Sequence, residues 1–207
     1  MRKFFLPLIL ILSAGLAFAS DNITFTAGST SVSLQEGNRE VSLSGNAAVT
    51  TGSLTIQADS ITLSGDNYES ISCSGSILIT DSDQGLSIRT SSLFYDRTSE
   101  RLLISSWCEI SDTANELVAS ASSLYYDRNA ELIELEMNVE LVKNTSDGIL
   151  SASAQRVTFD RAGSTLALSG AAGVSWKDDD YQASVITIDL DEEKITLSGQ
   201  IGGTVHG

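Results

Sequence analysis

The chain has 207 residues, and its 12 Lys and Arg residues are outnumbered by 27 Asp and Glu residues, which gives a formal net charge of −15. A surface this acidic repels nucleic acid and anionic lipid headgroups, so neither is expected as a partner. The single histidine, His206, argues against a histidine-based catalytic triad and against a zinc cluster.

The first residues have the features of a secretory signal peptide. Two basic residues, Arg2 and Lys3, precede the apolar run FFLPLILILSAGLAFA, which ends in the small-residue pattern Ala17-Phe18-Ala19. We predict that residues 1–19 are cleaved and that residues 20–207 form one exported domain. The alternative is an uncleaved membrane anchor, for which the apolar run is slightly short.

A short alternating run recurs six times along the rest of the chain. The copies begin at Val41, Ile71, Leu102, Ile133, Leu166 and Ile195, and their middle positions are Gly45, Gly75, Ser106, Met137, Gly170 and Gly199. The spacings between these middle positions are 30, 31, 31, 33 and 29 residues. A period of this length is typical of a repeat architecture.

Within each run, apolar residues occupy every second position. In the fourth copy, four polar residues from Glu134 to Glu140 separate the apolar positions Ile133, Leu135, Met137, Val139 and Leu141. This period of two predicts a strand with one buried face and one solvated face.

The first half of each repeat is also extended, but its parity changes partway. Leu86, Ile88 and Thr90 share one parity, whereas Leu93 and Tyr95 share the other. An extra residue at this point would bend the strand, as a β-bulge does. We therefore predict an all-β fold without helices in the mature chain. It is a single curved antiparallel meander of about twelve bent strands in six repeats of about 31 residues.

A Tyr/Phe-Asp-Arg motif ends three of the strands. By parity, Tyr95, Tyr126 and Phe159 point inward, and the aspartates that follow them favour turns. We expect Arg97, Arg128 and Arg161 to form an exposed column beside acidic neighbours. Because these residues recur in equivalent places instead of converging on one point, we expect no catalytic site, no metal and no cofactor.

The two cysteines, Cys73 and Cys108, would by default form a disulfide in an exported protein. In the repeat alignment both face inward, but they lie in neighbouring repeats and are offset by four residues along the strand. That offset alone corresponds to about 13 Å, which is beyond the reach of a disulfide. We predict two buried free thiols, and we expect the nearby Trp107 to face outward.

The segments ADSITLSG, ISCSGSILI, SLFYDRTSERLLISS and RVTFDRAGSTLALSG resemble the OstA/LptA family of periplasmic lipopolysaccharide-transport proteins, and the resemblance extends from about Ile23 to Val205. It implies a twisted jelly-roll-like fold, a periplasmic location, head-to-tail self-assembly, and a hydrophobic groove that shields acyl chains. Its implied partners are lipopolysaccharide or another glycolipid, and inner- and outer-membrane transport components that bind by edge-strand addition.

The inward apolar residues of the repeats are the candidates for that groove. They are Leu43, Ile61, Ile71, Leu93, Tyr95, Ile104, Leu124, Tyr126, Leu135, Met137, Phe159 and Leu168. The alternative function is that of an exported structural or adhesive β-repeat protein without lipid cargo, in which the same residues form only a packed core. The sequence leaves the identity of the amphiphile open.

Overall fold

The computed structural model describes residues 22–35 and 38–206, and their regular structure is one antiparallel β-sheet. The all-β prediction is confirmed for these residues, which contain no helix able to cross a membrane. The predicted signal peptide, residues 1–19, lies outside the described residues. The strands are β1 (Ile23–Thr26), β2 (Ser29–Gln35), β3 (Asn38–Thr51), β4 (Leu54–Ser64), β5 (Ser70–Asp81), β6 (Leu86–Asp96), β7 (Arg101–Ile104), β8 (Cys108–Asp112), β9 (Leu117–Ala121), β10 (Ser123–Asp127), β11 (Leu132–Thr145), β12 (Gly148–Asp160), β13 (Thr165–Trp176), β14 (Asp179–Asp189), β15 (Lys194–Ser198) and β16 (Gly202–Thr204).

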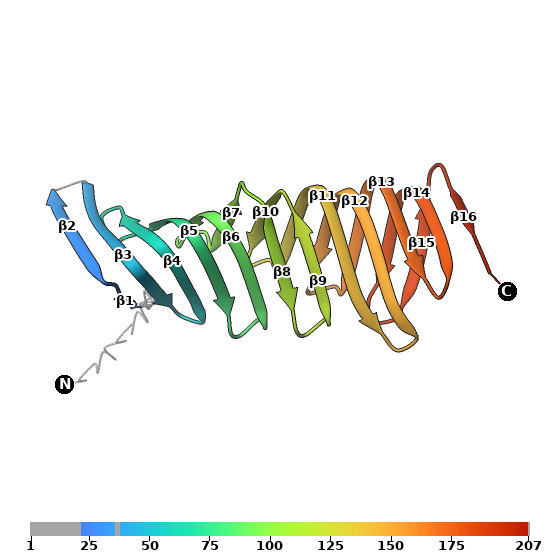
Figure 1. The fold of residues 1–207 in the computed structure, drawn as a ribbon, viewed down its shortest axis with the longest axis horizontal. Coiled ribbons are helices and arrows are strands. Elements are labelled where there is room, and N and C mark those ends of the chain that lie inside the picture. Colours follow the sequence, from blue (N-terminus) through green and yellow to red (C-terminus); the bar gives the residue numbers. More distant parts are fainter. Residues whose placement is uncertain (1–21, 36–37, 207) are drawn as a thin grey trace, which may run out of the picture.

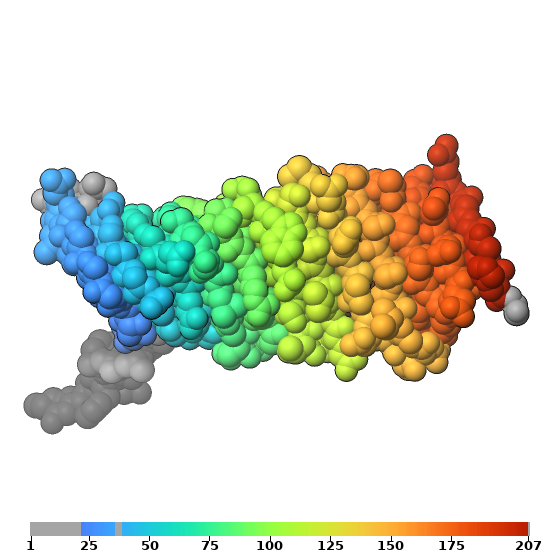
Figure 2. Space-filling model, viewed as in Figure 1, coloured from blue at the N-terminus to red at the C-terminus, as the bar shows by residue number. Residues whose placement is uncertain are grey.

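The strands follow one another along the long axis of the molecule in chain order (Figure 1). Four passes across the sheet are interrupted, so that β1 with β2, β7 with β8, β9 with β10, and β15 with β16 each make one pass in two pieces. The sixteen strands therefore make twelve passes. The space-filling view shows an elongated body in which the residues follow one another in sequence order from the N-terminal to the C-terminal end (Figure 2).

Each long pass bends near its middle, where the pairing register shifts. Between β3 and β4 the shift lies between Ser44 and Ala47, and it places one extra residue in β3. That corner is made by Gly45 at φ 76° and Asn46 at φ 52°, a left-handed conformation that glycine adopts at little cost. The sequence pattern had suggested the extra residue in the first strand of each repeat. The registers place it instead in the glycine-containing strand.

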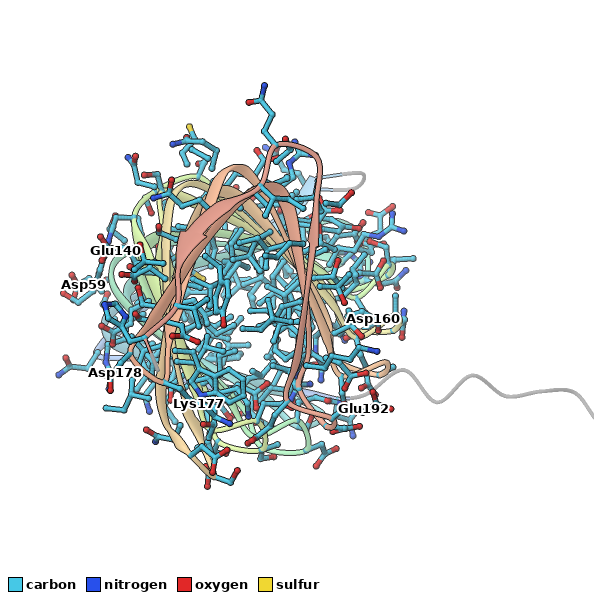
Figure 3. All side chains as sticks on the ribbon, turned by 90° about the vertical axis from the view of Figure 1, so that its right-hand side faces the viewer. Asp59, Glu140, Asp160, Lys177, Asp178 and Glu192 are labelled. Atoms are coloured by element: carbon cyan, nitrogen blue, oxygen red, sulfur yellow. The ribbon has the colours of Figure 1, made fainter. Side chains whose placement is uncertain are left out.

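The bends fold the sheet over, so that the two halves of each pass face each other across one elongated interior. Apolar side chains at alternate positions of both halves form one buried cluster that includes residues from Val41 to Leu190. Viewed along the long axis, carbon-rich side chains project into this interior, and labelled charged residues such as Asp59, Glu140 and Asp160 point outward (Figure 3). The core therefore runs along the molecule.

The turns lie on two rims. The turns after β3, β5, β8, β11 and β13 are called the Asp81 rim, and those after β4, β6, β10, β12 and β14 the Arg128 rim. On the Arg128 rim, the predicted turn role of the motif aspartates is confirmed. Asp96 Oδ1 accepts a hydrogen bond from the Thr98 amide at 2.9 Å, and Asp127 and Asp160 accept equivalent bonds.

Candidate functional site

Eleven of the twelve groove candidates lie in the buried interior. They all lie on the half of the folded sheet that contains β7 and β10, and they form one continuous cluster with the apolar residues of the other half: Leu43, Ile61, Ile71, Leu93, Tyr95, Ile104, Leu124, Tyr126, Leu135, Phe159 and Leu168. Cross-strand pairs such as Leu43 with Ile61 and Leu124 with Leu135 place them side by side on the inward face. The interior is therefore a long apolar surface to which the twelve strands from β3 to β14 contribute side chains.

The prediction for Met137 is wrong. Its side chain is 51% exposed, because Met137 and Asn138 both adopt left-handed φ values, 63° and 56°, at the register shift between Glu136 and Val139. Alternation holds only while the backbone stays extended, and these two residues turn the corner of the sheet. Met137 therefore takes the place that Gly45 and Gly170 have in other repeats, outside the interior.

Arg128 joins the two rims of the folded sheet. Its Nε donates to Asp81 Oδ2 at 2.8 Å, and its Nη2 donates to Ser53 Oγ at 2.9 Å. Asp81 pairs in the sheet with β4 and β6, whereas Arg128 follows β10, so this contact crosses from one rim to the other. The Arg128 side chain is 16% exposed and that of Asp81 2%. We call this contact the Arg128 bridge.

Arg161 makes the equivalent connection one repeat further along the molecule. Its Nε donates to Asp112 Oδ2 at 2.8 Å, and its Nη2 donates to the backbone oxygen of Gln84 at 2.7 Å. The exposed fractions of the Arg161 and Asp112 side chains are 4% and 0%. We call this contact the Arg161 bridge. The two bridges hold the rims together over the middle of the interior.

The expected exposed column of arginines is therefore wrong for Arg128 and Arg161. Burial opposes the charge of each guanidinium, but hydrogen bonds and charges from Asp81 and Asp112 respectively outweigh it and raise both arginine pKa values. The sequence held a signal for this arrangement. Asp81 and Asp112 continue the inward parity of their strands, and a buried carboxylate requires a partner.

Two tyrosine hydroxyls lie beside the bridges. Tyr95 donates a 2.6 Å hydrogen bond to Glu100, which also pairs with Arg128. The Tyr126 hydroxyl is buried and has no hydrogen-bond partner among the described residues. Burial raises the pKa of Tyr126 to about 12, and the charges of Asp81, Arg161 and Arg128 also act on it. Tyr126 lies two residues before Arg128 on the inward face of β10, and its hydroxyl has an unused donor.

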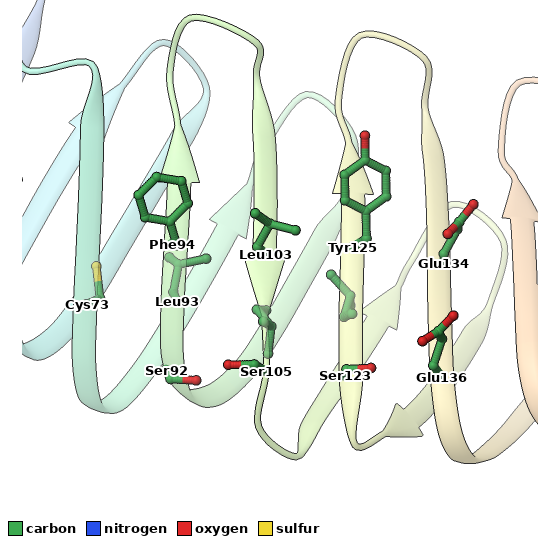
Figure 4. A pocket seen from close by; sticks show the side chains of 12 residues that line it. Cys73, Ser92, Leu93, Phe94, Leu103, Ser105, Ser123, Tyr125, Glu134 and Glu136 are labelled. Carbon is green, nitrogen blue, oxygen red and sulfur yellow. The ribbon is translucent and has the colours of Figure 1, made fainter.

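A pocket of about 440 Å³ lies over β6, β7, β10 and β11 (Figure 4). Its lining includes the outer residues Phe94, Leu103 and Tyr125, with Cys73 on β5 at one end and Glu134 on β11 at the other. Burial raises the pKa of Cys73 from an ordinary value of 9.0 to about 12, so its thiol is protonated at neutral pH and is a poor nucleophile. The pocket has the composition of a contact surface, with no activated nucleophile.

Both cysteines are free and buried, and Trp107 faces outward with 60% of its surface exposed. Within residues 22–35 and 38–206, no group of three or more His, Cys, Asp or Glu side chains could hold a metal ion. The chemistry of the described site is therefore that of apolar contact and of arginine–carboxylate pairing.

The sheet has an open edge at each end. At the N-terminal end, β2 pairs only with β3, and all seven of its residues are exposed. At the other end, β15 and β16 pair only with β14. Each terminal pass leaves backbone donors and acceptors available to a further strand.

Comparison with known proteins gives one family. The model of the family described as "LptA/(LptD N-terminal domain) LPS transport protein" matches residues 26–194. Solved structures that match include LptH of Pseudomonas aeruginosa, described as the LptA-homologous periplasmic component of the lipopolysaccharide transport device. That match has 12% identity and a TM-score of 0.31, and it covers 90% of this chain and 96% of LptH. No curated protein sequence matches the chain.

Proposed function

Because this chain belongs to the family of lipopolysaccharide transport proteins formed by LptA and the N-terminal domain of LptD, we propose that it is a periplasmic carrier that shields the acyl chains of lipopolysaccharide or a similar glycolipid between the inner and outer membranes. The interior of the folded sheet would hold the acyl chains, and the sugar head group would stay outside. The protein would act by binding alone, without catalysis.

The observation that carries the proposal is the apolar interior, which is continuous from Val41 to Leu190. An acyl chain gains about 0.8 kcal/mol for each methylene that it moves from water into such an interior. Several chains of one lipid would therefore bind well without directional contacts. The groove residues would be the eleven buried candidates, from Leu43 to Leu168, and Met137 would not contribute.

The open edges support a bridging role. We propose that β2 and the β15–β16 pass accept strands from membrane-bound transport components or from further copies of this chain. Such additions would extend the interior from one molecule to the next. The proposed signal peptide, residues 1–19, would deliver the chain to the periplasm.

A structural or adhesive repeat protein is the competing function, and the close packing of the interior favours it. Leu43, Ile61, Ile71 and Leu168 each have 0% exposed surface. A core that always stays this closed would bind no lipid. The two functions therefore differ in whether the interior admits an apolar molecule.

The first test is mass spectrometry of an organic extract of the protein, purified from the periplasm without detergent. Leu135→Arg would place a charge in the interior, and Glu140→Arg would place the same side chain on the outer face of the same strand. We expect a stoichiometric acylated lipid in the wild type and in Glu140→Arg. We expect the lipid to be lost from Leu135→Arg, with circular dichroism verifying that this variant is folded.

An environment-sensitive apolar dye gives a second reading of the interior. A carrier takes up the dye and releases it when lipopolysaccharide is added. A lipid-free extract together with absence of dye uptake would overturn the carrier and leave the structural repeat.

A further inference from the structure

The two bridges cross the path that a lipid would need. An amphiphile with its acyl chains inside the folded sheet and its head group outside must have the linkage between them pass through the slit between the rims. The Arg128 bridge and the Arg161 bridge span this slit with 2.8 Å contacts. Loading or sliding of such a molecule past the middle of the protein therefore requires both bridges to separate.

The residues of the bridges are suited to an exchange of partners. A guanidinium presents a planar set of donors that matches the oxygens of a phosphate as well as those of a carboxylate. When the rims part, Asp81 and Asp112 move into water, where a carboxylate is well solvated. Arg128 and Arg161 are then left on the other rim, facing the slit.

We propose that Arg128 and Arg161 are the head-group site of the carrier, and that each exchanges its aspartate for a phosphate group of the bound glycolipid as the rims open. This inference rests on the proposed function, because it assumes acyl chains in the interior. It adds the two residues that would hold the phosphate groups of the head group.

The Tyr126 hydroxyl is an independent observation in favour of this site. Tyr126 lies on the inward face of β10, two residues before Arg128, and its buried hydroxyl donates to no described residue, a situation that costs free energy in a closed protein. The phosphate held by Arg128 would supply the missing acceptor. Tyr126 would then donate a hydrogen bond to the ligand. The free-energy cost of its unpartnered hydroxyl would therefore be present in the closed form and absent from the open, ligand-bound form.

The surrounding carboxylates set the relative strength of the two arginines. Glu100 lies on the same rim as Arg128 and pairs with it, so Arg128 would keep one carboxylate after the rims separate. The other side-chain hydrogen bonds of Arg161 are to the side chain and backbone of Gln84, which are neutral, and the nearby Glu131 carboxylate acts on Arg161 through its charge without forming an ion pair with it. We therefore expect Arg161 to contribute more than Arg128 to phosphate binding. Because the chain as a whole has a net charge of −15, an anionic head group should bind at these two cations and be repelled by the acidic surface elsewhere.

The first experiment uses the wild-type mature chain and two probes, diphosphorylated lipid A and the same lipid with its phosphates removed. Their affinities are measured by displacement of the apolar dye. We expect the phosphorylated probe to bind at least about tenfold more tightly, as charge-assisted hydrogen bonds predict. Equal affinities would overturn the head-group site and leave the carrier intact. Failure of both probes to bind would overturn the carrier and the site together.

Two double variants separate recognition from closure. Asp81→Asn with Asp112→Asn weakens the bridges and keeps both arginines, so the phosphorylated probe should bind more tightly than to the wild type. Arg128→Gln with Arg161→Gln also weakens the bridges, but the preference for the phosphorylated probe should disappear. A purely mechanical role would shift affinity in the same direction in both variants and keep the preference, which would refute the proposal.

Arg101→Gln is the matched control, because Arg101 pairs with Asp127 on the outer surface with 51% of its side chain exposed. Its affinities should match the wild type.

If the glutamine variants fail to fold, Arg128→Lys with Arg161→Lys keeps the charges without the planar donors, and the preference for the phosphorylated probe should fall but persist. Inorganic phosphate alone should not increase dye uptake, because it brings no acyl chains. Uptake driven by inorganic phosphate would contradict the coupling of head group and chains.

Discussion

The guanidinium of Arg161 lies 2.8 Å from the carboxylate of Asp112, a residue 49 positions earlier on the opposite rim of the folded sheet. Neither side chain is more than 4% exposed. The contact joins two hairpin turns that are distant in the sequence into one polar cluster above an apolar interior. An equivalent contact is found one repeat earlier, between Arg128 and Asp81. The stability of the closed form and access to its interior therefore depend on the same residues.

Removing one partner of the Arg161 bridge should strongly destabilise the protein. Arg161→Gln leaves the buried Asp112 carboxylate without its countercharge, which is expected to cost about 3–5 kcal/mol of unfolding free energy. Urea denaturation followed by circular dichroism measures the change. Arg101→Gln, at an ion pair in which the arginine side chain is 51% exposed, should leave the unfolding midpoint unchanged. A similar midpoint for both variants would show that the bridge adds no stability.

A glycine corner should not tolerate a side chain. Gly75 has φ 98°, and a Cβ at this position would lie 2.5 Å from the Cβ of Asp59. We expect Gly75→Ala to lower the unfolding free energy by about 1–3 kcal/mol, through backbone strain and overlap. Gly173→Ala is the control, because its Cβ would meet no atom closer than 3.7 Å. A thermal unfolding series in which both variants match the wild type would contradict this account of the bend.

At Met137 the opposite substitution, from a side chain to glycine, should stabilise the protein. Met137→Gly should raise the unfolding free energy by about 1 kcal/mol, because the residue already has a left-handed φ and its side chain is half exposed. Leu135→Ala on the same strand removes a buried side chain and should cost about 2–5 kcal/mol. Urea midpoints of the two variants should thus move in opposite directions. A loss of stability in Met137→Gly would mean that its side chain makes stabilising contacts.

Alkaline pH should destabilise the fold through the buried thiols. Burial raises the pKa of Cys73 to about 12 and that of Cys108 to about 11, from an ordinary value of 9.0. Above pH 9 the unfolded chain releases these protons and the folded chain keeps them, so stability is complete below pH 9 and falls as pH rises. Between the pKa values of the unfolded and folded states, each thiol lowers the unfolding free energy by about 1.4 kcal/mol per pH unit.

Urea unfolding between pH 8 and 10 tests this sign. The wild type should lose stability more steeply than Cys73→Ala with Cys108→Ala, whose tyrosines still titrate. Both thiols should also react slowly with a maleimide at pH 8 in the folded wild type. Equal slopes for the two proteins would show that the thiols ionise normally in the folded state.

The repeat pattern predicted the strands because alternation is a local property of an extended chain. It placed Leu135, Tyr95 and Phe159 inward, and the structure buries all three. It failed at Met137, where the backbone leaves the extended conformation. The alignment of Met137 with Gly45 and Gly170 carried that information, since an aligned glycine marks a place where the backbone turns.

The partners of Arg128 and Arg161 could not be obtained in the same way. Which turn meets which depends on how far the strands tilt as the sheet folds over, and this is a property of the whole assembly. The residues that meet are 47 and 49 positions apart, so no single repeat contains both. What the sequence did contain was the inward parity of Asp81 and Asp112, which called for a buried countercharge.

The long reach of the bridges also bears on how the molecule would come apart. A stack of repeats that touch only their neighbours can unfold one strand at a time from either end. Here the Arg128 bridge ties Ser53 and Asp81 to the turn after β10, and the Arg161 bridge ties Gln84 and Asp112 to the turn after β12. The span from Ser53 to Arg161 is thereby made one cooperative block. Ser146 extends it, because its amide and hydroxyl donate to the Glu193 carboxylate at 3.0 and 2.7 Å and tie the turn after β11 to the turn after β14. Strands outside these ties, such as β1, β2 and β16, can fray and exchange without disturbing the block.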